Sequence, residues 1–192
     1  CASRPRRPGS SASTASAADS ATDTIPALTA AAAARFGGRV AVVDGERSLS
    51  YAELLDAARR FGAALVASGI GPGERVGIWA FNSLEWIVAV LGLWQAGAVA
   101  VPINTRFKGA EAADLLSRAR VRALITVTEF LGTDYVSMLR TAGVDLPDLS
   151  TIVVARGGAP EGTESWQGFL ARSTDEARAE VDRAAQTLLF SS

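Results

Sequence analysis

Short apolar segments alternate with helical patterns along most of the chain, and this alternation limits the possible folds more than any other feature of the sequence. The segments read as strands because they are short, rich in Val, Ile and Ala, and bounded by turn residues. They lie at residues 75–80, 98–101, 123–127 and 151–154. The helices predicted between them lie at residues 82–96, 109–118 and 135–142. Apolar strands joined through helices form parallel sheets that are buried on both faces. The predicted fold class is therefore α/β, a mostly parallel sheet with helices on both faces.

The segment before these strands is predicted to hold a helix and a hairpin. Residues 25–36 read as a helix because they are rich in alanine and are followed by two glycines. Residues 40–43 and 47–49 are predicted to be short strands. Asp44 and Gly45 join them, and this dipeptide is typical of tight hairpin turns.

Two helix starts carry capping signals. Ser50 and Glu53 have the S-x-x-E spacing of a capping box, in which each side chain satisfies a free backbone N–H at a helix start. Apolar residues then recur at helical spacing until Gly69, which closes this helix. Asn82 is predicted to cap the next helix. Glu85 lies in the first turn of that helix, where the dipole favours negative charge.

The last part of the chain departs from this pattern. Residues 156–186 are polar, with a weak helix predicted only near 166–171. The apolar run 187–190 reads as a strand that enters a turn at Ser191 and Ser192. A complete domain rarely stops inside such a run, so we expect a chain that is truncated here.

Composition divides the chain into two parts. Residues 1–22 are almost entirely Ala, Ser, Arg, Pro, Gly and Thr and are predicted to form a disordered, low-complexity tail. Residues 23–192 are predicted to form one folded unit. The formal net charge of −1 indicates no nucleic-acid surface, and the arginines near the start have no aromatic residues among them.

The sequence has one cysteine and no histidine, which limits the kinds of cross-link and active site that it can form. These counts exclude, within this sequence, an internal disulfide, a Cys/His zinc cluster and a Ser/His/Asp triad. The cysteine is Cys1, so a lipid-modified N-terminal cysteine stays open beside a simple fragment. The carboxylates are scattered and read as helix caps or solvated groups, so we predict no catalytic pair.

The apolar run 86–103 is long enough that a membrane span must be considered. Gly97 and Pro102 break it into a helix and a strand, and no Lys or Arg flanks it on the side of Asn82. No secretory signal pattern follows the arginines near the start. We therefore expect no integral membrane span and a cytoplasmic protein.

Three further features resemble binding sites but have simpler interpretations. The glycines at residues 69–73 follow a helix and precede a strand, the reverse of the order in a dinucleotide-binding loop. Arg118, Arg120 and Arg122 lie at a predicted helix end, where cations offset the dipole of the carbonyl groups. The tryptophans of the predicted core elements are expected to pack there, although they could border an acyl pocket.

Four strings stand out along the chain: LSYAEL at residues 49–54, GERVGI at 73–78, NSLEW at 82–86 and QAGAVAVPIN at 95–104. Together they resemble the N-terminal part of the adenylate-forming superfamily of acyl-CoA synthetases, luciferases and peptide-synthetase adenylation domains. The last string is the most specific, and the resemblance covers residues 25–192. It implies the N-terminal part of the large domain of the adenylate-forming fold, incomplete in this chain.

In that family a strand leads into a loop rich in Ser, Thr and Gly that ends in Pro-Lys-Gly and holds the phosphates of ATP. Ser191 and Ser192 resemble its first two residues, so the resemblance assigns them to cofactor binding. Such a loop directs backbone N–H groups and hydroxyls at phosphate oxygens. The resemblance assigns no catalytic and no metal-binding residue within this sequence.

The resemblance implies an AMP-forming acyl-CoA ligase. With ATP and Mg²⁺ such an enzyme converts a small-molecule carboxylic acid into an acyl-adenylate, and then transfers the acyl group to coenzyme A. Residues 104–111 and 130–135 further resemble actinobacterial ligases of fatty acid metabolism, including those that activate ring-bearing propanoates in steroid breakdown. We expect the chain alone to be inactive and to bind ATP weakly or not at all. The acyl substrate and the oligomeric state stay open.

Two other interpretations stay open at this point. A self-contained, non-catalytic α/β binding domain would account equally well for the predicted sheet and for the lack of catalytic residues. The second is a membrane-tethered protein built around residues 86–103.

Overall fold

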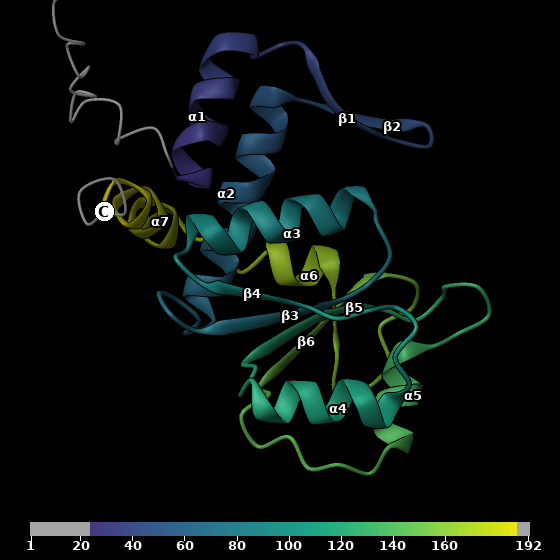
Figure 1. Ribbon diagram of the computed structural model, residues 1–192. Coiled ribbons are helices and arrows are strands. Elements are labelled where there is room, and N and C mark those ends of the chain that lie inside the picture. Colours follow the sequence, from purple (N-terminus) through teal and green to yellow (C-terminus); the bar gives the residue numbers. More distant parts are fainter. Residues whose placement is uncertain (1–23, 188–192) are drawn as a thin grey trace, which may run out of the picture.

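The computed structural model describes residues 24–187 (Figure 1). In chain order the elements are α1 (Ile25–Phe36), β1 (Val40–Asp44), β2 (Arg47–Ser50), α2 (Tyr51–Ala67), β3 (Arg75–Trp79), α3 (Leu84–Gln95), β4 (Val99–Pro102), α4 (Gly109–Arg118), β5 (Ala123–Val127), α5 (Tyr135–Thr141), β6 (Thr151–Arg156), β7 (Glu164–Ser165), α6 (Trp166–Leu170) and α7 (Asp175–Thr187).

Five strands form a parallel sheet in the order β4-β3-β5-β6-β7, which confirms the predicted fold class. The strand that enters the sheet first, β3, lies inside it. Val76 of β3 is in register with Ala100 of β4 on one side and with Ala123 of β5 on the other. The chain thus runs outward from β3 to β4, and then crosses back to β5 and continues in the opposite direction.

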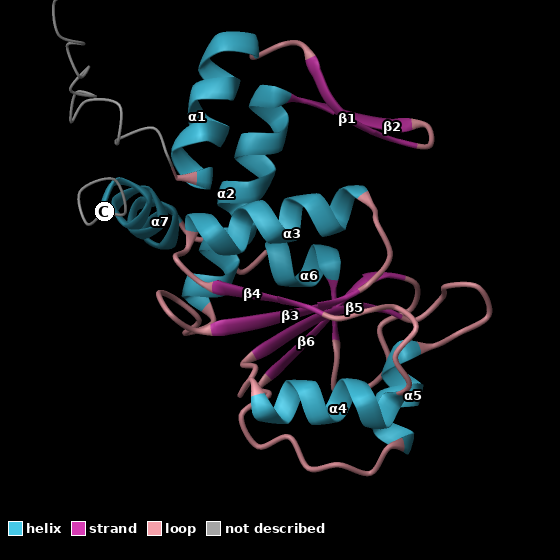
Figure 2. Ribbon diagram, in the orientation of Figure 1, coloured by secondary structure: helices cyan, strands magenta, loops and turns pink. Residues whose placement is uncertain are grey.

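Helices cover both faces of this sheet (Figure 2). α2, α3 and α6 lie on one face, and α4 and α5 lie on the other. Gly77 in β3 shows how closely α4 approaches, because a Cβ atom at this position would lie 3.1 Å from the side chain of Leu116. The sheet is therefore the middle layer of three, as expected for apolar strands joined through helices.

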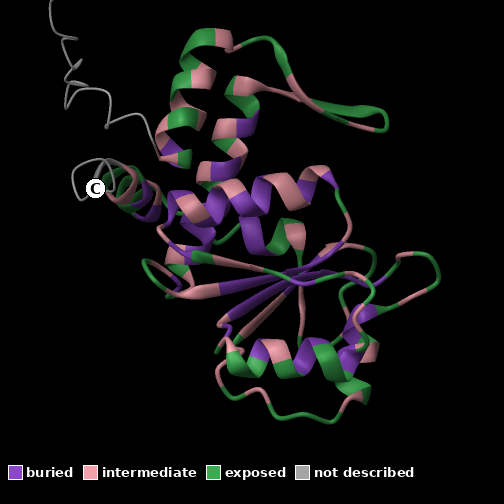
Figure 3. Ribbon diagram, viewed as in Figure 1, coloured by how far each residue is buried: buried purple, intermediate pink, exposed green. Residues whose placement is uncertain are grey.

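Burial is greatest in the strands at the middle of the sheet (Figure 3). β5 is buried along its whole length, and β3 is buried from its second residue onward. Trp79 at the end of β3 has no exposed surface. The prediction that the core tryptophans pack is therefore confirmed at this position.

The contact between α2 and α3 depends on two glycines. A Cβ atom at Gly62 would lie 2.7 Å from the backbone oxygen of Gly92, and a Cβ atom at Gly92 would lie 2.5 Å from the backbone oxygen of Ala58. Real side chains do not tolerate such distances, so the absence of side chains at both positions allows the two helix backbones to approach.

The N-terminal elements agree with the sequence patterns. β1 and β2 form the predicted antiparallel hairpin, and Gly45 at its turn has a φ angle of 64°. The capping box at the start of α2 is present: the Ser50 Oγ accepts from the Glu53 N–H, and the Glu53 carboxylate accepts from the Ser50 N–H at 2.8 Å.

Two predictions about elements were wrong in detail. Ser83 caps α3 in place of Asn82, because its Oγ accepts a hydrogen bond from the Trp86 N–H. Helix α7 was missed within the polar region, since its apolar face is narrow. The buried residues Ala177 and Val181 of α7 pack against Ala63 of α2.

The strand expected at residues 187–190 is tested only at its first residue, because Thr187 is the last residue of α7. Residues 188–190, Ser191, Ser192 and the predicted tail lie outside the described residues.

The apolar run at 86–103 divides into α3 and β4, as expected from Gly97. None of the helices in residues 24–187 has the length and apolar content needed to cross a bilayer.

Candidate functional site

The carboxyl edge of the parallel sheet is the place where this topology would form a binding crevice. β3 connects through α3 to β4, while β5 connects through α5 to β6 on the other side and over the other face of the sheet. Connections that leave in opposite directions open a crevice between the carboxyl ends of the two strands, and open α/β sheets bind ligands there.

Aromatic side chains fill this crevice. The rings of Phe81, after β3, and Phe130, after β5, are stacked with their centroids 4.5 Å apart. Below them Trp79 stacks on Tyr135, again with 4.5 Å between centroids, and both side chains are buried. Because these rings pack against one another from the two strand ends, the space between β3 and β5 belongs to the hydrophobic core.

Two of these aromatic residues, Trp79 and Tyr135, also hold the loop that follows β4 through hydrogen bonds. The indole N–H of Trp79 donates to the backbone oxygen of Asn104 at 3.2 Å, and the hydroxyl of Tyr135 donates to the backbone oxygen of Thr105 at 3.0 Å. Burial raises the pKa of Tyr135, so the hydroxyl stays protonated as a donor. The loops after β3, β4 and β5 are thereby joined at one edge.

Beside this aromatic block lies a cluster of four charged side chains, Asp44, Arg47, Glu85 and Arg156. The buried carboxylate of Glu85, at the start of α3, accepts from Arg47 at 2.6 Å and from Arg156 at 2.8 Å. Asp44 accepts from both arginines as well, and from the backbone N–H of Leu84 at 3.0 Å. The cluster therefore joins the β1–β2 hairpin, α3 and β6.

Both carboxylates of the cluster remain ionised at neutral pH. Burial tends to raise the pKa of Glu85, but hydrogen bonds from Arg47 and Arg156 outweigh it, so the pKa lies below its usual value. The pKa of Asp44 is also lowered, first by the hydrogen bond from the backbone of Leu84 and then by Arg156. Two arginines and two carboxylates leave the cluster formally neutral, and neither carboxylate is suited to act as a general acid at neutral pH.

A cleft of about 510 Å³ borders the cluster. Its lining includes Arg47, Glu85 and Arg156 of the cluster, and Trp166 and Gln167 of α6. The guanidinium of Arg156 also lies 5.3 Å from the ring centroid of Phe81, which adds a cation–π contact at the edge of the aromatic block. The cleft offers polar groups for binding, but residues 24–187 contain no group of His, Cys, Asp and Glu that could hold a metal ion.

The serines and arginines singled out from the sequence contribute nothing to this edge within residues 24–187. Ser191 and Ser192 lie outside the described residues. Arg118, Arg120 and Arg122 pair with three different carboxylates, at 3.4, 3.4 and 3.6 Å, which agrees with their interpretation as surface cations near the end of α4. The charged cluster was missed, because the partners of Glu85 lie 38 and 71 residues away in the sequence.

Comparison with known proteins places this geometry in context. The sequence pattern of a family described as "AMP-binding enzyme" matches residues 29–192. A methyl-dioxo-octahydro-indenyl-propanoyl:CoA ligase of Rhodococcus jostii is 40% identical over 165 residues, which cover 84% of this chain and 32% of the ligase. The corresponding ligase of Mycobacterium tuberculosis is 37% identical over 165 residues, 84% of this chain and 31% of the ligase.

Solved structures show the same arrangement of elements. The crystal structure of the anthranilate CoA ligase AuaEII in complex with anthranoyl-AMP matches with a TM-score of 0.72 and 26% identity, over 80% of this chain and 30% of that one. A long-chain-fatty-acid CoA ligase from Rhodopseudomonas palustris matches with a TM-score of 0.69 and 22% identity, over 79% of this chain and 36% of that one, which supports the fold alone. The chain spans about a third of the length of the curated relatives that it matches.

Proposed function

Because the chain belongs to the family of AMP-binding enzymes, we propose that it is the N-terminal part of an ATP-dependent acyl-CoA ligase. The match to this family over residues 29–192 carries the proposal. The relatives from Rhodococcus and Mycobacterium support an enzyme that activates a small-molecule carboxylic acid, with a ring-bearing propanoate or a fatty acid as the first candidates. We propose that it acts in the cytoplasm.

The proposed reaction has two steps. An oxygen of the substrate carboxylate attacks the α-phosphorus of ATP, which forms the acyl-adenylate and releases pyrophosphate. The sulfur of coenzyme A then attacks the acyl carbonyl, its proton is lost, and AMP leaves. Catalysis of this kind depends on positioning and on stabilising the charge of the phosphates.

The described residues supply only part of what this reaction needs. Aromatic rings occupy the crevice between β3 and β5, so we place ATP elsewhere. Residues 24–187 also hold no cluster suited to Mg²⁺, and we assign the ion no ligand among them. We propose that Ser191 and Ser192 contact the phosphates of ATP through their hydroxyl and backbone N–H groups.

Pyrophosphate release by the full-length protein tests this function. The protein would be mixed with ATP, Mg²⁺ and coenzyme A, and offered a bicyclic ring propanoate, a long-chain fatty acid or benzoate. Acid-dependent release, with AMP formed in equal amount, is the expected result. A protein that releases no pyrophosphate with any acid would instead support a non-catalytic α/β binding domain.

A double substitution of Ser191→Ala and Ser192→Ala tests the phosphate contact. We expect kcat to fall by about 10- to 100-fold, because hydrogen bonds to charged phosphate oxygens are lost in the transition state. The matched control is Ser10→Ala with Ser11→Ala, an adjacent serine pair near the start of the chain, which should leave kcat unchanged. Equal rates for both double variants would remove the two serines from the proposed site.

A further inference from the structure

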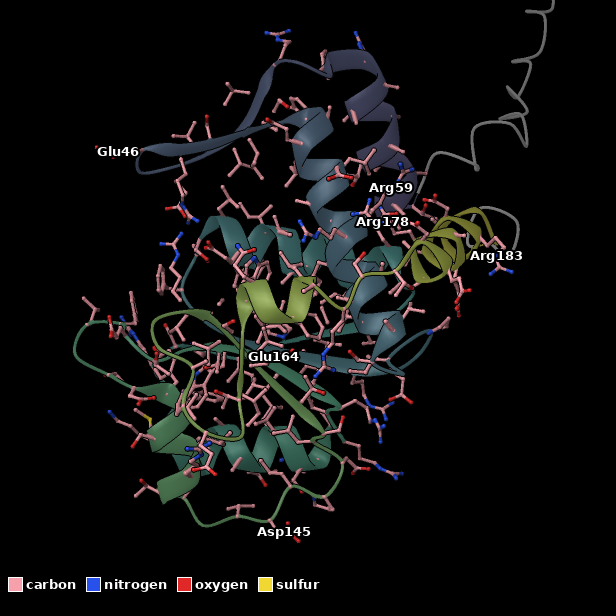
Figure 4. All side chains as sticks on the ribbon, turned by 180° about the vertical axis from the view of Figure 1, so that it is seen from behind. Glu46, Arg59, Asp145, Glu164, Arg178 and Arg183 are labelled. Carbon is pink, nitrogen blue, oxygen red and sulfur yellow. The ribbon has the colours of Figure 1, made fainter. Side chains whose placement is uncertain are left out.

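A cavity of about 290 Å³ lies where α1, α2, α3 and α7 meet, away from the carboxyl edge of the sheet. Its wall is mostly small and apolar, and its polar part comes from three side chains. The apolar residues are Pro26, Ala27, Ala30 and Ala185, and the polar ones are Arg59, Gln95 and Asp182. Figure 4 shows Arg59 beside the junction of these helices.

Two residues that line this cavity have a buried nitrogen that makes no hydrogen bond. Gln95, the last residue of α3, is only 2% exposed, and its amide nitrogen has no hydrogen-bond partner. The Nε of Arg59 is also buried and has no hydrogen bond, although Asp182 lies 3.3 Å from it as an ion pair. A buried donor without an acceptor is costly, so the unpartnered Gln95 amide beside the Arg59 guanidinium indicates a site for a group that accepts hydrogen bonds.

The charged and apolar residues that line the cavity limit which kind of ligand could bind there. A carboxylate has two oxygens, which could accept from the Gln95 amide and from the Arg59 guanidinium together. The side chain of Asp182 is 49% exposed, so it can turn toward solvent and leave Arg59 to a ligand. Alanine and proline side chains around the donors leave room for a short alkyl group but offer no further polar partner.

We propose that this junction binds a short-chain carboxylate, with its oxygens on Gln95 and Arg59 and its alkyl group against α1 and α7. The site is separate from the carboxyl edge, because Gln95 ends α3 while Glu85 lies in its first turn. A helix of 12 residues is about 18 Å long. A ligand here would contact α1 and α7 together with the two helices that pack through Gly62 and Gly92.

Titration of the full-length protein with sodium butyrate, against sodium chloride at equal ionic strength, tests the proposal by NMR. We expect the side-chain amide resonances of Gln95 and the Nε–H resonance of Arg59 to shift with one saturable dissociation constant. In Gln95→Leu the Arg59 resonance reports binding, and in Arg59→Met the Gln95 resonance does so. Each variant is expected to weaken binding about tenfold, the loss of one hydrogen bond to a charged group.

Arg60→Met is the matched control, because Arg60 is the exposed neighbour of Arg59 on α2 and does not line the cavity. This variant should bind butyrate as the unaltered protein does. Gln95→Leu is expected to fold normally, since it removes no hydrogen bond of the amide nitrogen. Resonances that butyrate leaves unmoved, or a buried water as the only partner of both donors, would overturn the proposal. The NMR shifts measure butyrate binding and not the ligase reaction, so this proposal can fail or succeed independently of the proposed ligase activity.

Discussion

Glu85 shows how one side chain can join segments that are far apart in the sequence. Its carboxylate is buried, and its two arginine partners come from the hairpin and from the end of β6. We expect Glu85→Gln to lower the free energy of unfolding by about 2 kcal/mol, because the charge-assisted hydrogen bonds from the partly exposed Arg47 and Arg156 lose their ionised acceptor. Urea unfolding measures the change. Glu46→Gln, the same substitution at the exposed hairpin turn, should change stability by less than about 0.5 kcal/mol.

The same carboxylate gives a pH dependence with a defined sign. The folded-state pKa of Glu85 lies below the ordinary value of 4.5, so its contribution to stability is present above that pH and is lost as the pH falls through the folded pKa. The unfolding free energy should therefore decline below about pH 4.5, and Glu85→Gln should flatten the decline. Equal slopes in the two proteins would show that the ionised Glu85 carboxylate does not stabilise the fold.

At the scale of elements, helices α2 and α3 cross at close range in the core. Gly92→Ala would bring a methyl group within 2.5 Å of the Ala58 backbone and 2.9 Å of the Phe61 ring, so the helices would have to move apart. We expect a loss of about 2 kcal/mol of unfolding free energy, the range typical of an overpacked core, together with a lower thermal midpoint.

Gly71→Ala is the control for this helix contact, because a Cβ atom there would meet nothing within 4 Å and the φ angle is not in the left-handed region. Its stability should stay within about 0.5 kcal/mol of the unaltered protein, or rise slightly. If calorimetry gave the two variants the same thermal midpoint, the close approach at Gly92 would not limit the packing of α2 on α3.

At the scale of the whole molecule, residues 24–187 form a sheet with its own core but no recognisable site for phosphate chemistry. The crevice between β3 and β5 is filled by aromatic rings, and the charged cluster beside it is neutral. We therefore expect the 192-residue chain to bind ATP weakly or not at all, while the full-length protein binds it. Isothermal titration of both with ATP and Mg²⁺ measures the difference, and equal dissociation constants would contradict this prediction.

Local patterns in the sequence determined the elements and the class of the fold. The capping box at Ser50, the hairpin turn at Gly45 and the break at Gly97 depend on neighbouring residues, so they could be predicted without a structure. The parallel sheet also followed, because strands buried on both faces must be apolar throughout. Helix α7 was not predicted from the sequence, because its apolar face is too narrow to give a clear helical pattern within a polar stretch.

Only the tertiary structure decided which side chains meet. The order of strands in the sheet brings Phe81 to Phe130, and the fold of the hairpin brings Asp44 to Arg156, 112 residues further along the chain. The same holds for the cavity at Gln95, which α1 and α7 line from the two ends of the described chain. Periodicity and propensity act over a few residues, whereas these contacts arise from packing across the sheet and between helices, which no local pattern encodes.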